Sequence, residues 1–215
     1  MKPVTTRMLV TAALALNVGS ASGHAMRAVP RGGGSALPAR ADTGRRYTHA
    51  DVQFMQRMIA HHAQALVMTG TVPTRTGRKD LRTLAERIDA SQQAEIEMMQ
   101  RWLKERGEVV PSPDGPHAHH ETDGDRALMP GMLSEAELAR LSGTKGAKFD
   151  RLFLQYMIRH HQGALTMVST LLGAPGAAQE PEIFRFVSDV DADQNAEITR
   201  MRKMLGASGS KLTPR

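Results

Sequence analysis

The chain has 215 residues and a formal net charge of +6 at pH 7, with 14 methionines, 9 histidines and no cysteine. Its length allows one domain or two small ones, and the absence of cysteine excludes disulfides, iron–sulfur clusters, thiolate zinc sites and thiol catalysis. Aromatic residues make up only 4% of the chain, which is low for a β-sandwich or β-barrel and favours helices.

The N-terminal segment has the pattern of a secretory signal. Lys2 and Arg7 precede an apolar run over 8–18 that is too short to span a bilayer, and small residues follow it. We expect residues 1–25 to be a cleaved signal peptide of a secreted or periplasmic protein with no stable membrane insertion afterwards; a membrane anchor or a disordered tail is the alternative. The Gly-, Pro-, Ser- and Arg-rich segments 26–47 and 207–215 are predicted to be disordered.

Two long helices are predicted in the first half of the remaining chain. The first covers 49–69, with Thr48 as its cap and Gly70 as its stop, and a loop over 71–77 carries a proline. The second covers 78–106 and ends at a glycine. Together with Thr48 and Gly107 these helices form repeat one, residues 48–107.

A linker over 108–146 follows. Ser134 and Glu137 have the spacing of a capping box and predict a short helix over about 135–141. Short histidine-rich tracts bind Cu(II) or other divalent metals loosely, although a solvated polar loop is an equal alternative. The weaker candidate ligands in this linker are His117, His119, His120, Met129 and Met132.

The second half repeats the first. Helices are predicted over 147–172 and from Pro181 to about 206, and residues 150–167 match 51–68 at ten of 18 positions with an offset of 99. Repeat two is therefore residues 147–206. We predict an all-α fold over 48–206: a four-helix bundle made of two duplicated helix hairpins.

The inner faces of these helices carry unusual residues. The helical period places His61 and His62 on the apolar face of the first helix, with Gln64 among the residues that point the other way. Glu95 and Glu197 lie in the apolar stripes of the second helix of each repeat. A carboxylate is costly there unless it is paired or ligated, and the histidines of the neighbouring helix are the obvious partners.

These residues predict one metal site in each half. Thioether sulfur suits Cu(I), and imidazole suits copper among other metals, so copper is the favoured ion, with Cu(I) preferred at the helical sites. Packing by methionine and a purely structural histidine–glutamate pair are the alternatives. The candidate ligands are Met58, His61, His62, Met68, Glu95 and Met99 in one half, and Met157, His160, His161, Met167, Glu197 and Met201 in the other.

No catalytic constellation is apparent. The chain contains no Glu-x-x-His and no His-Glu-x-x-His, which disfavours a di-iron centre and a zinc protease. Its basic residues are scattered without interleaved aromatics, so nucleic acid is not an expected partner. We predict a metal-binding protein that sequesters copper or exchanges it with a donor or acceptor protein. A metal-dependent oxidase and a metal-free envelope interaction module are the alternatives.

The paired blocks Phe54-x3-Met58-x2-His61-His62 and Phe153-x3-Met157-x2-His160-His161, each followed by alanine and methionine, resemble the domain of unknown function 305 family. So does the Met-Pro-Gly-Met run at 129–132. The resemblance covers about 48–206. It implies a ferritin-like fold, export or lipid anchoring, and, as in some periplasmic members, copper or silver binding that contributes to metal tolerance. The second half is poorer in sulfur, since Leu154 and Arg200 replace Met55 and Met98.

Overall fold

A computed structural model describes residues 46–112 and 128–209 of the chain. The expected signal peptide, nearly all of the 26–47 segment and the linker histidines lie outside these residues, as does the end of the C-terminal tail. Within the described parts every regular element is a helix. The fold is all-α, as predicted.

Helix α1 spans His49–Arg75 and helix α2 spans Lys79–Glu105. Thr48 and Asp51 form the capping box at the start of α1. The prediction that α1 stops at Gly70 is wrong. A side chain at Gly70 would meet nothing, and the extra turns bury Val72, so packing outweighs the cost of the glycine and of Pro73.

The C-terminal carbonyls of α1 find a partner on α2. Arg82 donates from Nε to the carbonyl oxygen of Thr76, at 2.9 Å, and from Nη2 to that of Pro73. These bonds satisfy groups that a helix end otherwise leaves to water. The loop between α1 and α2 is consequently reduced to residues 76–78, shorter than the predicted 71–77.

The second half has the same construction. Helix α4 spans Gly146–Leu172 and helix α5 spans Pro181–Gly209, slightly beyond the predicted end near 206. This extension means that 207–209 are helical, so the prediction of a tail disordered from 207 is wrong there. Between the halves lies the short helix α3, Glu135–Ser142, whose Ser134–Glu137 capping box confirms the sequence reading.

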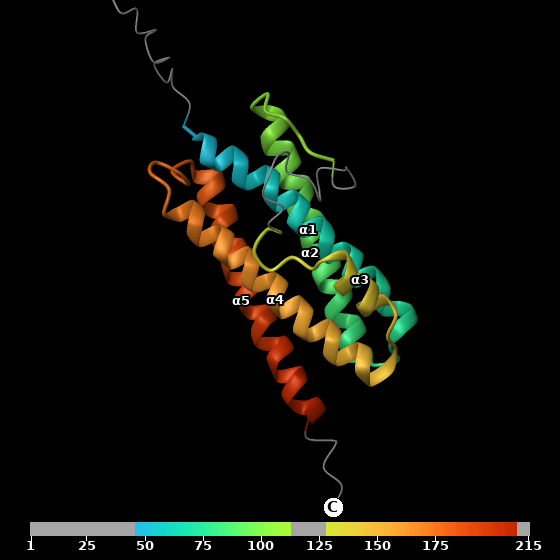
Figure 1. Cartoon of the computed structure of the whole chain (residues 1–215). Coiled ribbons are helices and arrows are strands. Elements are labelled where there is room, and N and C mark those ends of the chain that lie inside the picture. The colour runs from blue at the N-terminus through green and yellow to red at the C-terminus, as the bar shows by residue number, and fades with distance from the viewer. Residues whose placement is uncertain (1–45, 113–127, 210–215) are drawn as a thin grey trace, which may run out of the picture. The chain divides into compact units, whose positions relative to one another are not determined.

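The helices are arranged around the α1–α4 pair. Helix α1 packs against α2, α4 packs against α5, and α1 and α4 contact each other across the middle (Figure 1). The segment 128–133, which precedes α3, runs over α1 and α4 in the same view. The two repeated helices with the histidine pairs therefore lie at the centre of the bundle.

Two apolar clusters form the core. One contains Met55, Met58 and Trp102 together with residues of α4 and α5, and the other contains Met68, Phe149 and Phe153 with residues of α2 and α5. Both clusters draw on both halves of the chain. Each repeat thus completes its core with the other, as expected for hairpins that cannot bury their apolar faces alone.

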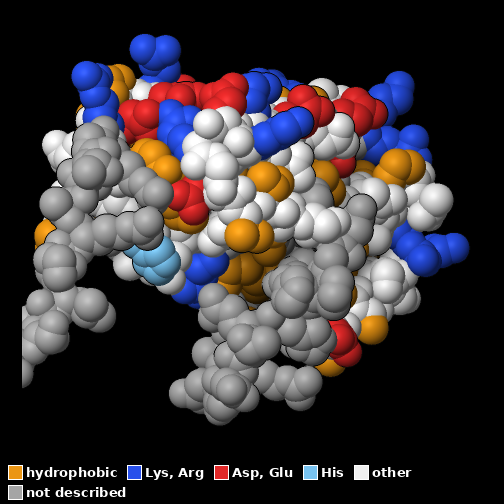
Figure 2. Space-filling model, turned by 90° about the horizontal axis from the view of Figure 1, so that it is seen from above, with side chains coloured by type: hydrophobic (Ala, Val, Ile, Leu, Met, Phe, Trp, Pro, Cys, Tyr) orange, Lys and Arg blue, Asp and Glu red, His pale blue; other side chains and the backbone are white. Residues whose placement is uncertain are grey.

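The surface carries charges of both signs. On the face drawn in Figure 2, Lys and Arg side chains alternate with Asp and Glu along one edge, and hydrophobic side chains show between them. This pattern fits solvated helix faces. In the part of the chain that the structure describes, no helix has the length and apolar character needed to cross a membrane.

Candidate metal site

The four histidines of the repeats meet where α1 and α4 cross. His61 and His62 lie on α1, His160 and His161 on α4, and each is 0% exposed. The ring centroids of His61 and His160 are 3.9 Å apart, while the neighbouring pairs on each helix are separated by 6.4 Å and 6.3 Å. The offset of 99 in the sequence relates His61 to His160. The duplication has placed equivalent residues face to face.

The outer histidines bind the inward-facing carboxylates. His62 Nε2 lies 2.5 Å from Glu95 Oε2, and His161 Nε2 lies 2.5 Å from Glu197 Oε2. An ionised carboxylate only accepts hydrogen bonds, so in each pair Nε2 carries the proton. In the neutral ring the lone pair is then on Nδ1. The sequence predicted that histidines of the neighbouring helix are the partners of these glutamates, which the structure confirms, but it did not single out His62 and His161.

The inner histidines differ from each other. His61 Nε2 donates to the carbonyl oxygen of Pro130 at 3.0 Å, whereas neither ring nitrogen of His160 has a hydrogen-bond partner among the described residues. Across all four rings, Nδ1 is buried and without a partner in the described parts of the chain. Buried polar atoms are normally satisfied, so this cluster of ring nitrogens needs an explanation.

Burial keeps the inner rings neutral. Removal from water lowers the pKa of His61 from its ordinary 6.5 to about 3, with His62 and His161 adding to the effect. Removal from water also holds the pKa of His160 well below its usual range, and the neighbouring histidines act in the same direction. A metal ion binds the neutral imidazole, so these rings need lose no proton at neutral pH to act as ligands.

The segment 128–133 covers this site from one side. A Cβ on Gly163 would lie 1.8 Å from the Pro130 oxygen, and Gly131 has a φ of +78°. Gln64 donates to the Leu133 carbonyl at 2.9 Å and accepts from its N–H at 2.7 Å. The backbone of this segment therefore lies directly on α4 at Gly163 and is fixed to α1 by Gln64.

The sequence reasoning missed this contact and placed Gln64 wrongly. Gln64 was expected to point away from the core, but it is 3% exposed because the 128–133 segment covers that face of α1. Gln64 and Gly163 occupy equivalent positions in the two repeats, since 64 + 99 = 163. This difference between the repeats could have revealed the contact from the sequence. The Gln64 side chain binds the 128–133 segment, and the lack of a side chain at Gly163 lets the segment approach α4.

The structure groups the methionines differently from the hypothesis of one site per half. Met58 and Met99 of the first repeat lie in one core cluster with Met167 of the second. Met157 and Met201 of the second repeat lie in the other cluster with Met68 of the first. Each cluster therefore combines two methionines of one repeat with one methionine of the other repeat. All six side chains are buried.

The remaining candidates have mixed positions. Met132 is buried, and Met129 is partly buried against the cluster that contains Met58. The linker candidates His117, His119 and His120 lie outside the described residues. Gln92 and Gln194, each one turn before the inward-facing glutamate, are buried and have unpartnered amide atoms in the described structure. Within that same part of the chain, no three His, Asp or Glu side chains converge closely enough to hold a metal ion by themselves.

Comparison with known proteins identifies a family and several similar structures. Residues 51–205 match the sequence profile of DUF305, a domain of unknown function. A crystal structure of a DUF305 fragment from Deinococcus radiodurans is 36% identical, with a TM-score of 0.62, and the match covers 75% of this chain and 98% of that one. No curated protein sequence matches the chain.

Two further solved structures are similar. A DUF305 protein from Streptomyces coelicolor, inferred to be secreted, is 28% identical with a TM-score of 0.63, and the match covers 74% of this chain and 92% of that one. CopM in its Cu(II)-bound form is 26% identical with a TM-score of 0.55, and the match covers 73% of this chain and 96% of that one.

Proposed function

The chain belongs to the DUF305 family, and from this premise we propose that it is an exported copper-binding protein that sequesters the metal or passes it on. The observation that carries the proposal is the group of four fully buried histidines at the crossing of α1 and α4, each with an Nδ1 that has no partner among the described residues. Copper is the cargo in this proposal. The N-terminal signal pattern and the Streptomyces relative support export.

The hydrogen bonds of three of these rings support a ligand role. A metal-binding histidine usually donates its second ring N–H to a carboxylate or a backbone carbonyl, which fixes the tautomer and the ring orientation. His62 and His161 donate to Glu95 and Glu197, and His61 donates to Pro130. All three rings are thus held with Nδ1 as the free lone pair. Purely structural histidines would have no reason to leave that nitrogen unsatisfied.

The choice of copper follows from the buried methionines of the two core clusters. The described nitrogen and oxygen donors do not form a three-ligand site alone, so methionine sulfur would complete the coordination. Met58, Met99 and Met167 in one cluster, with Met157, Met201 and Met68 in the other, offer thioethers that suit Cu(I) better than harder ions. The similarity to Cu(II)-bound CopM supports the same metal.

A first experiment measures Cu(I) affinity by anaerobic titration against a competing chelator. The test variant is Met58→Leu/Met99→Leu/Met167→Leu, because leucine keeps the volume and apolar character of these buried side chains at a small cost in stability. We expect at least a tenfold loss of affinity, which corresponds to about 1.4 kcal/mol. A triple alanine variant of His117, His119 and His120 is the control for loose binding in the linker. Cu(I) affinity unchanged in the methionine variant would contradict the sulfur ligands.

A second experiment separates a binding role from a structural role for His160. Because neither ring nitrogen of His160 makes a hydrogen bond of ordinary geometry within the described structure, His160→Leu removes a desolvated polar ring and at most a weak interaction with the His61 backbone. We expect the metal-free protein to keep or gain stability in urea while copper affinity falls. His62→Leu, which leaves Glu95 without its partner, is the matched control and should lose stability. If His160→Leu binds copper as the wild type does, the histidine site is refuted.

A further inference from the structure

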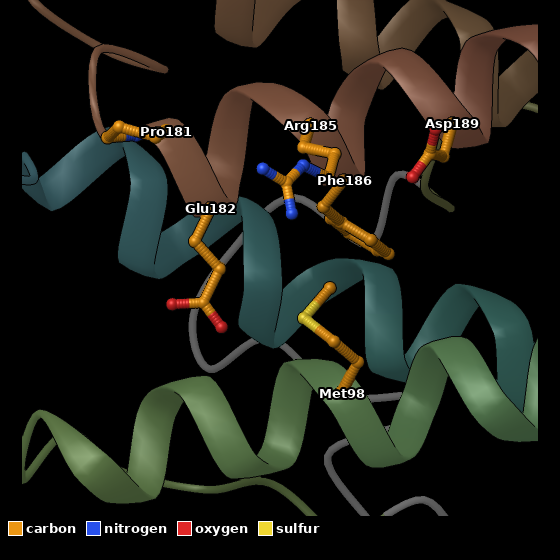
Figure 3. A pocket seen from close by; sticks show the side chains of 6 residues that line it. All are labelled: Met98, Pro181, Glu182, Arg185, Phe186 and Asp189. Carbon is orange, nitrogen blue, oxygen red and sulfur yellow. The ribbon is translucent and has the colours of Figure 1, made fainter.

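A groove lies between α2 and α5. At one end Arg106 of α2 pairs with Glu180 and Glu182, and at the other Arg78 donates to the Met204 carbonyl at 3.4 Å. Between these contacts the two helices make little direct contact. They leave a space of about 510 Å³ lined by Met98, Pro181, Glu182, Arg185, Phe186 and Asp189, with the Met98 thioether directed toward α5 (Figure 3). We call this space, together with the neighbouring carboxylates of Asp193, Glu95 and Glu197, the α2–α5 groove.

The continuation of the groove is acidic. Asp193 follows Asp189 by one turn of α5, and Glu95 precedes Met98 by about one turn of α2. Partial burial raises the pKa of Asp193, and the charges of Glu95, Glu197 and Asp189 raise it further, in that order. Asp193 is therefore near enough to each of these three carboxylates to be repelled by it.

Positive charge does not cancel this acidity. Arg185 is exposed and lines the groove, while Arg106 is engaged by Glu180 and Glu182 at its end. Arg185 is therefore the one cation among the residues that line the space, beside Glu182 and Asp189, and Asp193 lies near Asp189. The chain as a whole has a net charge of +6, so the groove is a local exception to the charge of the protein. A concave acidic surface concentrates cations and raises their association rates.

The buried histidines that contact Glu95 and Glu197 give an independent observation. His62 and His161 are fully buried, their Nε2 atoms point at Glu95 and Glu197, and their Nδ1 atoms lack partners in the described structure. The two glutamates keep 14% and 18% of their side chains exposed. Each glutamate is thus in contact with a buried ring while part of its side chain is exposed to solvent.

The opposite approach is covered. Above His61 the Pro130 carbonyl accepts the ring N–H, and Gln64 fixes the same segment through two bonds to Leu133. An ion arriving from that side would have to displace the 128–133 segment. On the groove side, the partly exposed side chains of Glu95 and Glu197 would have to rotate away from their histidines.

We infer that the α2–α5 groove is the route by which metal cations pass between solvent and the buried histidines. Asp189 and Asp193 attract the ion, and Glu95 and Glu197 release their histidines to take it and transfer it inward. This inference rests on the proposed copper-binding function and adds the side of the bundle from which the ion reaches the histidines. If the ion enters through the groove, the association rate constant depends on the charge of the groove, whereas the affinity depends on the ligands.

The test is the rate of Cu²⁺ binding in a stopped-flow instrument. Trp102 is the chain's single tryptophan and lies in the core cluster of Met58 and Met99, so quenching by the paramagnetic ion reports arrival. The variants are Asp193→Asn and Asp193→Lys at an exposed position, and Asp189→Asn/Asp193→Asn. The matched control, Glu86→Gln/Glu97→Gln, removes the same charge from other exposed positions of α2.

At low salt we expect the association rate constant to fall in the order wild type, Asp193→Asn, Asp193→Lys. The double groove variant should fall about 5- to 10-fold and the control less than about twofold, with the differences vanishing at high salt. Equal effects of the groove and control variants would overturn the route while leaving the binding function intact. Absence of saturable quenching in the wild type, with no Cu(I) bound in the chelator titration, would overturn the proposed function itself and the route with it.

Discussion

The contact between Gly163 and the 128–133 segment gives a sharp prediction for Gly163→Ala. The new Cβ would lie 1.8 Å from the Pro130 oxygen, 2.4 Å from the Pro130 carbonyl carbon and 2.8 Å from Gly131 Cα. Since nonbonded carbon and oxygen atoms normally stay more than about 3.2 Å apart, the segment or the helix must move by roughly 1.5 Å. All three contacts are with backbone, so no side chain can rotate away to make room.

The magnitude follows from the bonds that the displacement breaks. His61 Nε2 lies 3.0 Å from the Pro130 oxygen, and a shift of roughly 1.5 Å takes it beyond hydrogen-bonding distance. The two Gln64–Leu133 bonds belong to the same segment and are strained by the same movement. Losing one to three buried hydrogen bonds, with the penalty for groups left unsatisfied, costs about 3–5 kcal/mol. The helix propensity of alanine returns about 1 kcal/mol, for a net loss of about 2–4 kcal/mol.

Urea denaturation and thermal unfolding of the metal-free protein check this value. A domain of this size should lose roughly 10 °C in Tm. Gly70→Ala is the matched control, because Gly70 lies inside α1 and its Cβ would meet nothing within 4 Å. That variant should gain up to about 1 kcal/mol. If Gly163→Ala is as stable as the wild type, or gains stability as Gly70→Ala does, the segment is not seated on α4 as described.

Two further predictions concern stability. The pKa of His61 is about 3 in the folded protein and about 6.5 in the unfolded protein, so the unfolded state binds more protons below pH 6.5. The free energy of unfolding is therefore highest above pH 6.5 and falls as the pH is lowered from about 6.5 to 3. Urea titrations at pH 5 should show a loss of about 2 kcal/mol from His61 alone. A pH-independent midpoint across this window would contradict the buried neutral ring. Asp51 accepts from the N–H and hydroxyl of Thr48 and from Ala178 N–H at 2.7–2.8 Å, so Asp51→Ala should cost about 2–3 kcal/mol by chemical denaturation. Its repeat counterpart Asp150 has an Oδ1 without a partner in the described structure, so Asp150→Ala should cost less, and equal losses would refute the assignment.

Local sequence rules fail in this protein where another part of the chain supplies packing. The stop signal at Gly70 is ordinary, yet α1 continues because α2 offers Arg82 to its last carbonyls and because Val72 is buried. Gln64 lies on the outward face by helical period, yet it is buried under a segment about 70 residues away. In both cases the deciding contact is distant in sequence, and a propensity or a period contains no information about it.

The candidate site divides in the same way. The repeat and the inward direction of the histidines are predictable, because a helix period fixes which residues share a face. A histidine partner for Glu95 and Glu197 is predictable too, since an inner carboxylate requires one, but the choice of His62 and His161 is not. The exchange of Met68 and Met167 between the two core clusters is not predictable either, since it depends on how α1 crosses α4.

The sequence by itself therefore determined the four long helices, the duplication and the residue types that face the core. Only the tertiary structure decided that the equivalent histidines His61 and His160 meet, that Pro130 accepts a hydrogen bond from His61, and that a groove lies between α2 and α5. The physical reason is that a periodic pattern specifies a buried face without its partner. Which surfaces meet is settled by the packing of whole helices and by a glycine that allows two backbones to touch.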